Sequence, residues 1–225
     1  MVKQLWGYKM DKQLIYEPMT VITDLILAGI TAWFAYEINS WYWERLMNVH
    51  WHFSRAFWML ALGALLGAIS HGIGPHLDAG IKDILWRLTT ISIGLASFFL
   101  LMAAFHHVFE FSTVELLRWI AVIFLVIYLI MIWRDPRFIN VIRFYAPTMV
   151  FVLLVMVYSY FASSAEGTGW LIAGILVSFL AAGVQMSGFS LHKHFNYNDI
   201  YHVIQMAGMY LLYRGALVLK DCSVN

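Results

Sequence analysis

The chain has 225 residues, of which 62% are hydrophobic and only 12% are charged, and its formal net charge is +1. A soluble domain carries about 25% charged residues, so this composition excludes an ordinary water-soluble protein and indicates an integral membrane protein. The near-neutral charge gives no reason to expect nucleic acid as a partner. The single cysteine, Cys222, excludes an intrachain disulfide and a cysteine-based metal site.

Seven segments are apolar and long enough to predict membrane-spanning helices, because a span needs about 20 mostly apolar residues. They cover residues 18–38, 54–72, 83–105, 114–133, 139–162, 169–190 and 199–219. Their connections are short, and no linker-like stretch divides them. We therefore predict an all-α fold, with residues 1–225 forming a single domain built as a seven-helix transmembrane bundle.

Prolines mark several of the predicted boundaries. Pro18 lies where the first span begins, a position at which the missing N–H of proline costs nothing. Pro136 ends the fourth span, since a proline disfavours helix for the residue before it. Pro147 lies inside the fifth span, where we expect it to kink the helix.

Basic residues predict the orientation of the bundle, because Lys and Arg collect in cytoplasmic loops. The N-terminal stretch lacks the apolar core of a cleavable signal peptide, so the first span is expected to act as the insertion signal. On its side of the membrane lie Lys3, Lys9, Lys12, Lys82, Arg87, Arg134, Arg137, Arg143 and Lys193. On the other side lie Arg45, Arg55, Arg118, Arg214 and Lys220. This distribution predicts a multi-pass protein with a cytoplasmic N-terminus and an exoplasmic C-terminus.

Polar residues appear at the cytoplasmic ends of the first three spans. Asp24 lies in the first span, with Thr20 one turn before it. Ser70 and His71 end the second span after small residues that allow another helix to approach. Asp83 opens the third span and begins a polar stripe, which we expect to face protein rather than lipid. The other members of this stripe are Arg87, Thr90, Gly94 and Ser97.

The seventh span opens on the same side with the stretch HFNYNDIYHVIQ. It contains Asn198, Asp199 and His202, with Gln205 three residues further on. Four spans thus bring ionisable groups to one face of the membrane. Ionisable residues inside spans are energetically expensive and by default mark a functional site, so this convergence predicts one.

Each of these residues also has a structural interpretation. An asparagine followed by Asp199 is typical of a helix N-terminus, and Asp83 with Arg87 four residues on is typical of a surface ion pair. A lone buried histidine is usually a hydrogen-bonded core residue. His202 lies a turn deeper than the cap, and Asp24 has no basic neighbour on its own helix. These two residues fit a structural interpretation least well.

The pattern resembles the CREST superfamily, which includes the alkaline ceramidases, the adiponectin and progestin receptors and hemolysin-III-like proteins. The similarity lies in seven spans, with Ser70 and His71 ending the second, Asp83 opening the third and NDIYHVIQ opening the seventh. In that superfamily three histidines hold zinc, and the metal-bound water hydrolyses a lipid amide or ester. The resemblance implies zinc ligands at His71 and His202. EPMTVITD together with FNYNDIYH is also similar to an uncharacterised bacterial seven-helix family.

The sequence departs from the superfamily at two positions. Asn198 stands where the first histidine of the last span belongs, and Gly67 stands where the serine belongs, one turn before His71. A catalytic zinc takes three protein ligands and a water, so another residue is needed beside His71, Asn198 and His202. The candidates for this ligand are Asp24, His76, His194 and Asp199.

Two functions are therefore expected as alternatives. The first is a membrane-embedded, metal-dependent hydrolase of a lipid amide or ester. In it Asp24 or Asp83 takes the proton of the zinc-bound water, and Ser70 helps to hold the oxyanion. The second is a non-catalytic receptor-like module, or an accessory subunit that partners other membrane proteins. Its polar groups form a hydrogen-bonded core, with a lipid, haem or pigment as ligand. The departure at Asn198 favours the second alternative, and whether the protein is an enzyme stays open.

Overall fold

The computed structural model describes residues 14–222, which form seven α-helices and one short 3-10 turn. Their bounds are α1 Pro18–Arg45, α2 Asn48–Ile73, η1 Gly74–His76, α3 Ala79–Val108, α4 Phe111–Arg134, α5 Phe138–Ser163, α6 Thr168–Ser187 and α7 Tyr197–Val218. The predicted all-α fold is confirmed. Six of the described helices, α1 to α6, are long and apolar enough to cross a membrane, as in a multi-pass membrane protein.

The seventh helix is less apolar than the others, because its first turns carry the polar residues of the opening stretch. The orientation of the bundle stays a prediction. Three of the lysines on which it depends, Lys3, Lys9 and Lys12, lie outside the described residues. Pro147 lies within α5, which remains one continuous helix from end to end.

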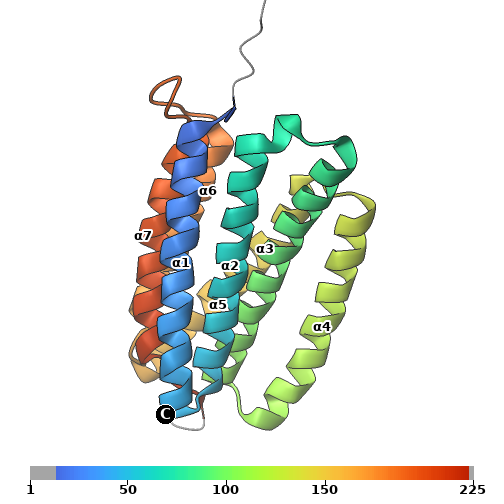
Figure 1. Cartoon of the computed structure of the whole chain (residues 1–225). Coiled ribbons are helices and arrows are strands. Elements are labelled where there is room, and N and C mark those ends of the chain that lie inside the picture. Colours follow the sequence, from blue (N-terminus) through green and yellow to red (C-terminus); the bar gives the residue numbers. More distant parts are fainter. Residues whose placement is uncertain (1–13, 223–225) are drawn as a thin grey trace, which may run out of the picture.

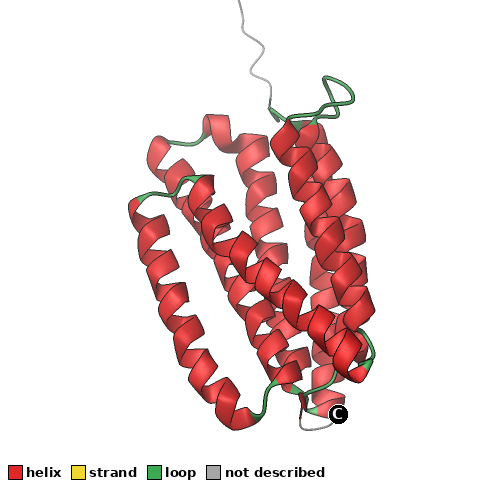
Figure 2. Cartoon of the chain, turned by 180° about the vertical axis from the view of Figure 1, so that it is seen from behind, coloured by secondary structure: helices red, strands yellow, loops and turns green. Residues whose placement is uncertain are grey.

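The helices form an elongated bundle in which chain neighbours pack side by side (Figure 1). The most extensive packing joins α1 to α2, α2 to α3 and α6 to α7. α7 also contacts α1, which closes one side of the bundle, while α4 lies at the opposite edge. Seen from behind, α5 crosses the bundle obliquely (Figure 2) and contacts α3 and α6. α1 and α7 are thus neighbours although they lie at opposite ends of the sequence.

Glycines allow α6 and α7 to approach closely. A Cβ atom at Gly174 would lie 2.7 Å from the side chain of Leu212, and one at Gly215 would lie 2.6 Å from that of Leu171. Small residues at such interfaces let helix backbones come together in a membrane. The position of α7 is therefore fixed along one whole face by α6.

The segment after α7 is hydrogen-bonded to the start of α2. The carboxylate of Asp221 accepts hydrogen bonds from the backbone N–H groups of Asn48 and Val49, both at 2.8 Å, and from the Asn48 side chain at 2.9 Å. The first N–H groups of a helix have no partner within the helix. Asp221 therefore caps α2, whose own N-cap residue, Met47, has no side-chain cap.

Candidate functional site

A buried carboxylate–imidazole pair joins α1 to α7. His202 Nε2 lies 3.1 Å from Asp24 Oδ1, and the two side chains are only 7% and 5% exposed. The other ring nitrogen, Nδ1, lies 2.9 Å from the hydroxyl of Thr23. Two consecutive residues of α1 therefore hold both nitrogens of one histidine of α7. We refer to Thr23, Asp24 and His202 as the latch.

The hydrogen bonds of the latch constrain where its protons lie. The Thr23 hydroxyl also lies within hydrogen-bonding distance, 3.1 Å, of the Thr20 carbonyl. A hydroxyl has one proton to donate. When Thr23 gives this proton to the carbonyl, its oxygen accepts a proton from His202 Nδ1. A second proton then lies between Nε2 and Asp24 Oδ1, so the pair is either an imidazolium with a carboxylate or a neutral imidazole with a carboxylic acid.

Several buried oxygens around the latch lack a donor. Within residues 14–222, Asp24 Oδ2, Thr20 Oγ1 and Asp199 Oδ1 are buried without a hydrogen-bond partner. Asp24 Oδ2 faces Gly67 of α2, where a Cβ atom would lie 3.1 Å from that oxygen. The glycine therefore makes room for a carboxylate that reaches between α2 and α7. A buried polar atom without a partner costs roughly 1–3 kcal/mol, so the latch is not fully satisfied.

The start of α7 is a capping box. The side chain of Asn196 accepts a hydrogen bond from Asn198 N at 2.8 Å, and Asp199 Oδ2 accepts one from Asn196 N at 2.7 Å. The Asn198 side chain accepts a hydrogen bond from Gln185 Nε2 of α6 at 3.2 Å. The capping interpretation of this stretch is confirmed, with Asn196 as the cap residue. Asn198 and Asp199, predicted as metal ligands, thus have structural partners.

The residues expected at the end of α2 do not join the latch. His71 Nδ1 lies 3.1 Å from Glu17 Oε2, and both side chains are partly exposed. The hydroxyl of Ser70 donates to the Leu66 carbonyl of its own helix at 2.9 Å. His71 and His202 each lie beside a different acidic residue near the start of α1.

Asp83 belongs to a joint between α3 and α4. It pairs with Arg87 at 2.6 Å and is 48% exposed. Arg87 Nη1 also donates to the carbonyl groups of Ile132, at 3.0 Å, and of Trp133. These carbonyls lie in the last turn of α4, where cations are favoured. The i,i+4 ion pair that the sequence suggested between Asp83 and Arg87 is therefore present, and Arg87 links the start of α3 to the end of α4.

The inner part of the polar stripe of α3, Thr90, Gly94 and Ser97, is buried and forms a packing surface, whereas Asp83 at its start is exposed. The ring of Tyr128 from α4 fills the space beside Gly94 and leaves no room there for a Cβ atom. The Tyr128 hydroxyl donates to the Thr90 carbonyl at 2.6 Å. Thr90 and Ser97 donate to carbonyl groups of their own helix. The stripe thus holds α4 against α3.

The described residues do not fit the zinc site that the resemblance implies. No group of three or more His, Cys, Asp or Glu side chains in residues 14–222 is placed to hold a metal ion. Both nitrogens of His202 are engaged by α1. Of the other candidate ligands, the ring of His76 packs edge-on against Tyr16, and that of His194 lies near His192 in the exposed loop before α7.

Sequence reasoning missed two residues that complete these contacts. Thr23 is adjacent to Asp24, and Glu17 directly precedes α1. The stretch EPMTVITD contains both, so its acidic and hydroxyl residues at helical spacing were an available signal. Their partners lie on other helices, and only the rotation of α1 within the bundle decides which of its residues face His71 and His202.

The fold and the buried ionisable residues together define a multi-pass helical membrane protein with a polar site inside the bundle. Residues 19–221 match a family of unknown function, DUF6962, and the chain belongs to this family. No curated protein matches the chain, and no solved structure matches it. The family match does not bear on the resemblance to the CREST superfamily, which stays a prediction.

Proposed function

We propose that the protein is a non-catalytic, receptor-like module of seven membrane-spanning helices in which the latch holds α7 against α1. Closing and opening of this contact would give the bundle two arrangements. The observation that carries the proposal is the double engagement of His202, whose Nδ1 and Nε2 both meet α1 residues. A histidine used in this way joins two helices and has no ring nitrogen left over for a metal.

The unpaired oxygens support a contact that can be released. Asp24 Oδ2 and Asp199 Oδ1 are buried without donors among the described residues, so the closed arrangement retains an energetic cost. The attraction within a buried ion pair only partly offsets the cost of removing its charges from water. A bound ligand or a partner protein that supplies donors to these oxygens can therefore shift the balance between the two arrangements.

The proposal treats α7 as the seventh span. Its 22 residues extend about 33 Å at 1.5 Å per residue, which is enough for the apolar core of a bilayer. Its polar residues Asp199, His202 and Gln205 are buried, while Val203 and Tyr210 are exposed. A helix with this distribution turns its polar face toward protein and its apolar face toward lipid. Seven spans also agree with the predicted cytoplasmic N-terminus and exoplasmic C-terminus.

Hydrogen exchange of α7 tests the latch directly. In detergent-solubilised protein we expect Asp24→Asn and His202→Ala to speed exchange in the first three turns of α7, because opening there becomes easier. Asp83→Asn makes the same chemical change at the same end of the bundle. It should leave α7 unchanged. Exchange in Asp24→Asn equal to that of wild type would contradict the proposal.

Metal content separates this proposal from the lipid-hydrolase prediction. Purified protein is analysed for zinc together with the His71→Ala and His202→Ala variants. The latch proposal expects no stoichiometric zinc in wild type. About one zinc per chain that is lost in both variants would overturn it in favour of a metal-dependent site.

A further inference from the structure

A second candidate site lies at the other end of the bundle, between α2, α3 and α4. A pocket of about 430 Å³ opens there, a volume within the range of small-molecule sites. His52 of α2 and His106 of α3 line it, with their rings stacked at a centroid distance of 5.0 Å and an interplanar angle of 24°. His52 Nδ1 is buried and has no hydrogen-bond partner within the described part of the chain.

The charged lining of the pocket is cationic. Arg118 reaches it from the second turn of α4 and is 38% exposed. One of its nitrogens pairs with Glu115 at 2.9 Å, which leaves other guanidinium N–H groups able to donate. None of the described residues that line the pocket is acidic. A guanidinium beside imidazoles, with no carboxylate in the lining, is the complement of an oxyanion.

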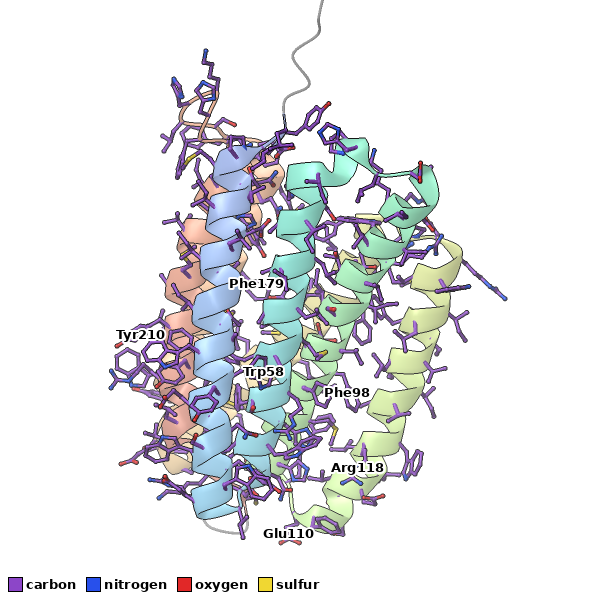
Figure 3. All side chains as sticks on the ribbon, viewed as in Figure 1. Trp58, Phe98, Glu110, Arg118, Phe179 and Tyr210 are labelled. Carbon is purple, nitrogen blue, oxygen red and sulfur yellow. The ribbon has the colours of Figure 1, made fainter. Side chains whose placement is uncertain are left out.

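The remaining walls are apolar and aromatic. Trp51 and Phe99 meet edge to face at 5.9 Å, and Phe98 and Met102 add hydrophobic surface from α3. Phe98 and Arg118 lie on the side of the bundle where α4 faces α3 (Figure 3). On the outer face of α4, Trp119 and Ile123 are strongly exposed, as expected for residues that contact acyl chains. The helix that carries Arg118 thus also presents an apolar surface to the outside of the bundle.

We infer that this pocket, the histidine pocket, binds an anionic amphiphile. Its phosphate or carboxylate group would meet Arg118 and His52, and its apolar part would lie along Phe98 and Met102. A lipid headgroup and a free phosphate ion share the oxyanion chemistry. The aromatic walls, and a position at the membrane end of three helices, favour the lipid. This site is separate from the latch, so either proposal can fail without the other.

Ligand-induced stabilisation tests this inference, because a ligand that binds the folded state raises its Tm in a concentration-dependent way. The probes are dioctanoyl phosphatidylglycerol, dioctanoyl phosphatidylcholine and inorganic phosphate, each added to protein in a neutral detergent. Native mass spectrometry measures the Kd for each lipid. We expect phosphatidylglycerol to bind and stabilise more strongly than phosphatidylcholine, and inorganic phosphate to have little effect.

Two variants place the ligand in the pocket. Arg118→Gln should weaken phosphatidylglycerol binding by roughly tenfold, the effect of losing one charge-assisted hydrogen bond. His52→Gln should also weaken phosphatidylglycerol binding while Arg118 is still present. Arg214→Gln is the matched control, because Arg214 lies on α7, where it donates to Tyr210, and does not line the pocket. Equal loss in Arg118→Gln and Arg214→Gln, or stabilisation by inorganic phosphate equal to that by the lipid, would overturn the inference.

Discussion

Asp24 and Asp221 are both buried aspartates, at opposite ends of the same bundle, and they have very different surroundings. Three N–H donors of α2 engage both oxygens of Asp221. Asp24 has a partner for only one oxygen, and that partner is an imidazole whose proton the pair shares. Donors fixed at a helix N-terminus hold a carboxylate in one state. A carboxylate that has an imidazole partner on one oxygen and no partner on the other retains a choice of states, and the proposed function therefore depends on Asp24 and not on Asp221.

Removal of the latch carboxylate should have the largest effect. Asp24→Ala leaves His202 buried without its partner, and we expect a loss of roughly 3 kcal/mol of stability, as for other broken buried pairs. A double-mutant cycle with His202→Ala, measured by unfolding in detergent, isolates the pair. A coupling energy of at least about 0.5 kcal/mol is expected for residues in contact. Strict additivity would show that the two side chains do not act together.

The cap aspartate should matter less and in a different way. Asp221→Ala removes the cap of α2, and we expect a loss of about 2 kcal/mol. Hydrogen exchange should rise in the first turn of α2 and not in α7. If Asp221→Ala also increased hydrogen exchange in α7, as expected for Asp24→Asn, the two aspartates would not act independently.

A methyl group placed beside Asp24 Oδ2, the oxygen without a hydrogen-bond partner, provides the next test. Gly67→Ala adds a methyl group 3.1 Å from Asp24 Oδ2, so we expect a loss of about 1 kcal/mol as the carboxylate shifts. Gly63→Ala is the matched control, because its added Cβ atom would have its nearest contact at 3.8 Å. A larger loss in the control than in Gly67→Ala would argue that Asp24 is free to move.

The smallest expected effect on stability, and one that depends on pH, comes from the exposed residue Asp135. Hydrogen bonds from Arg137 lower the pKa of Asp135, in the connection between α4 and α5, to about 2 from 3.8. A lowered folded-state pKa contributes stability that is complete above about pH 4 and is lost as the pH falls toward 2. Arg137→Gln should therefore lower Tm slightly at pH 7 and by much less at pH 2, where the Asp135 carboxylate is partly protonated. An equal difference at both pH values would rule out this pair as the cause.

The sequence predicted those parts of the structure that depend on local spacing. Each of the seven predicted spans overlaps one of the described helices. The Asp83–Arg87 pair and the capped start of α7 were also foreseen, because i,i+4 geometry and capping patterns can be read from neighbouring residues. Asp24 and His202 were singled out because no local partner explained them.

The pairing of the site residues could not be predicted in the same way. His71 and His202 each have an acidic partner near the start of α1, and neither partner could be named from the pattern of the histidine's own helix. Helical periodicity assigns a residue to a face of its own helix, and the distance between two faces depends on how the helices rotate and tilt in the bundle. The cap from Asp221 to α2 was missed for the same reason, since 173 residues separate Asp221 from Asn48.

That separation also determines the order of events during biosynthesis. At about 5–20 residues per second, the ribosome needs roughly 7–30 s to continue from the end of α2 at Ile73 to Asp221. Throughout this interval α2 is already in the nascent chain while its first N–H groups still await their acceptor. The cap of α2 is therefore completed only after α7 has been synthesised, so a chain truncated before residue 221 has a second helix without this cap.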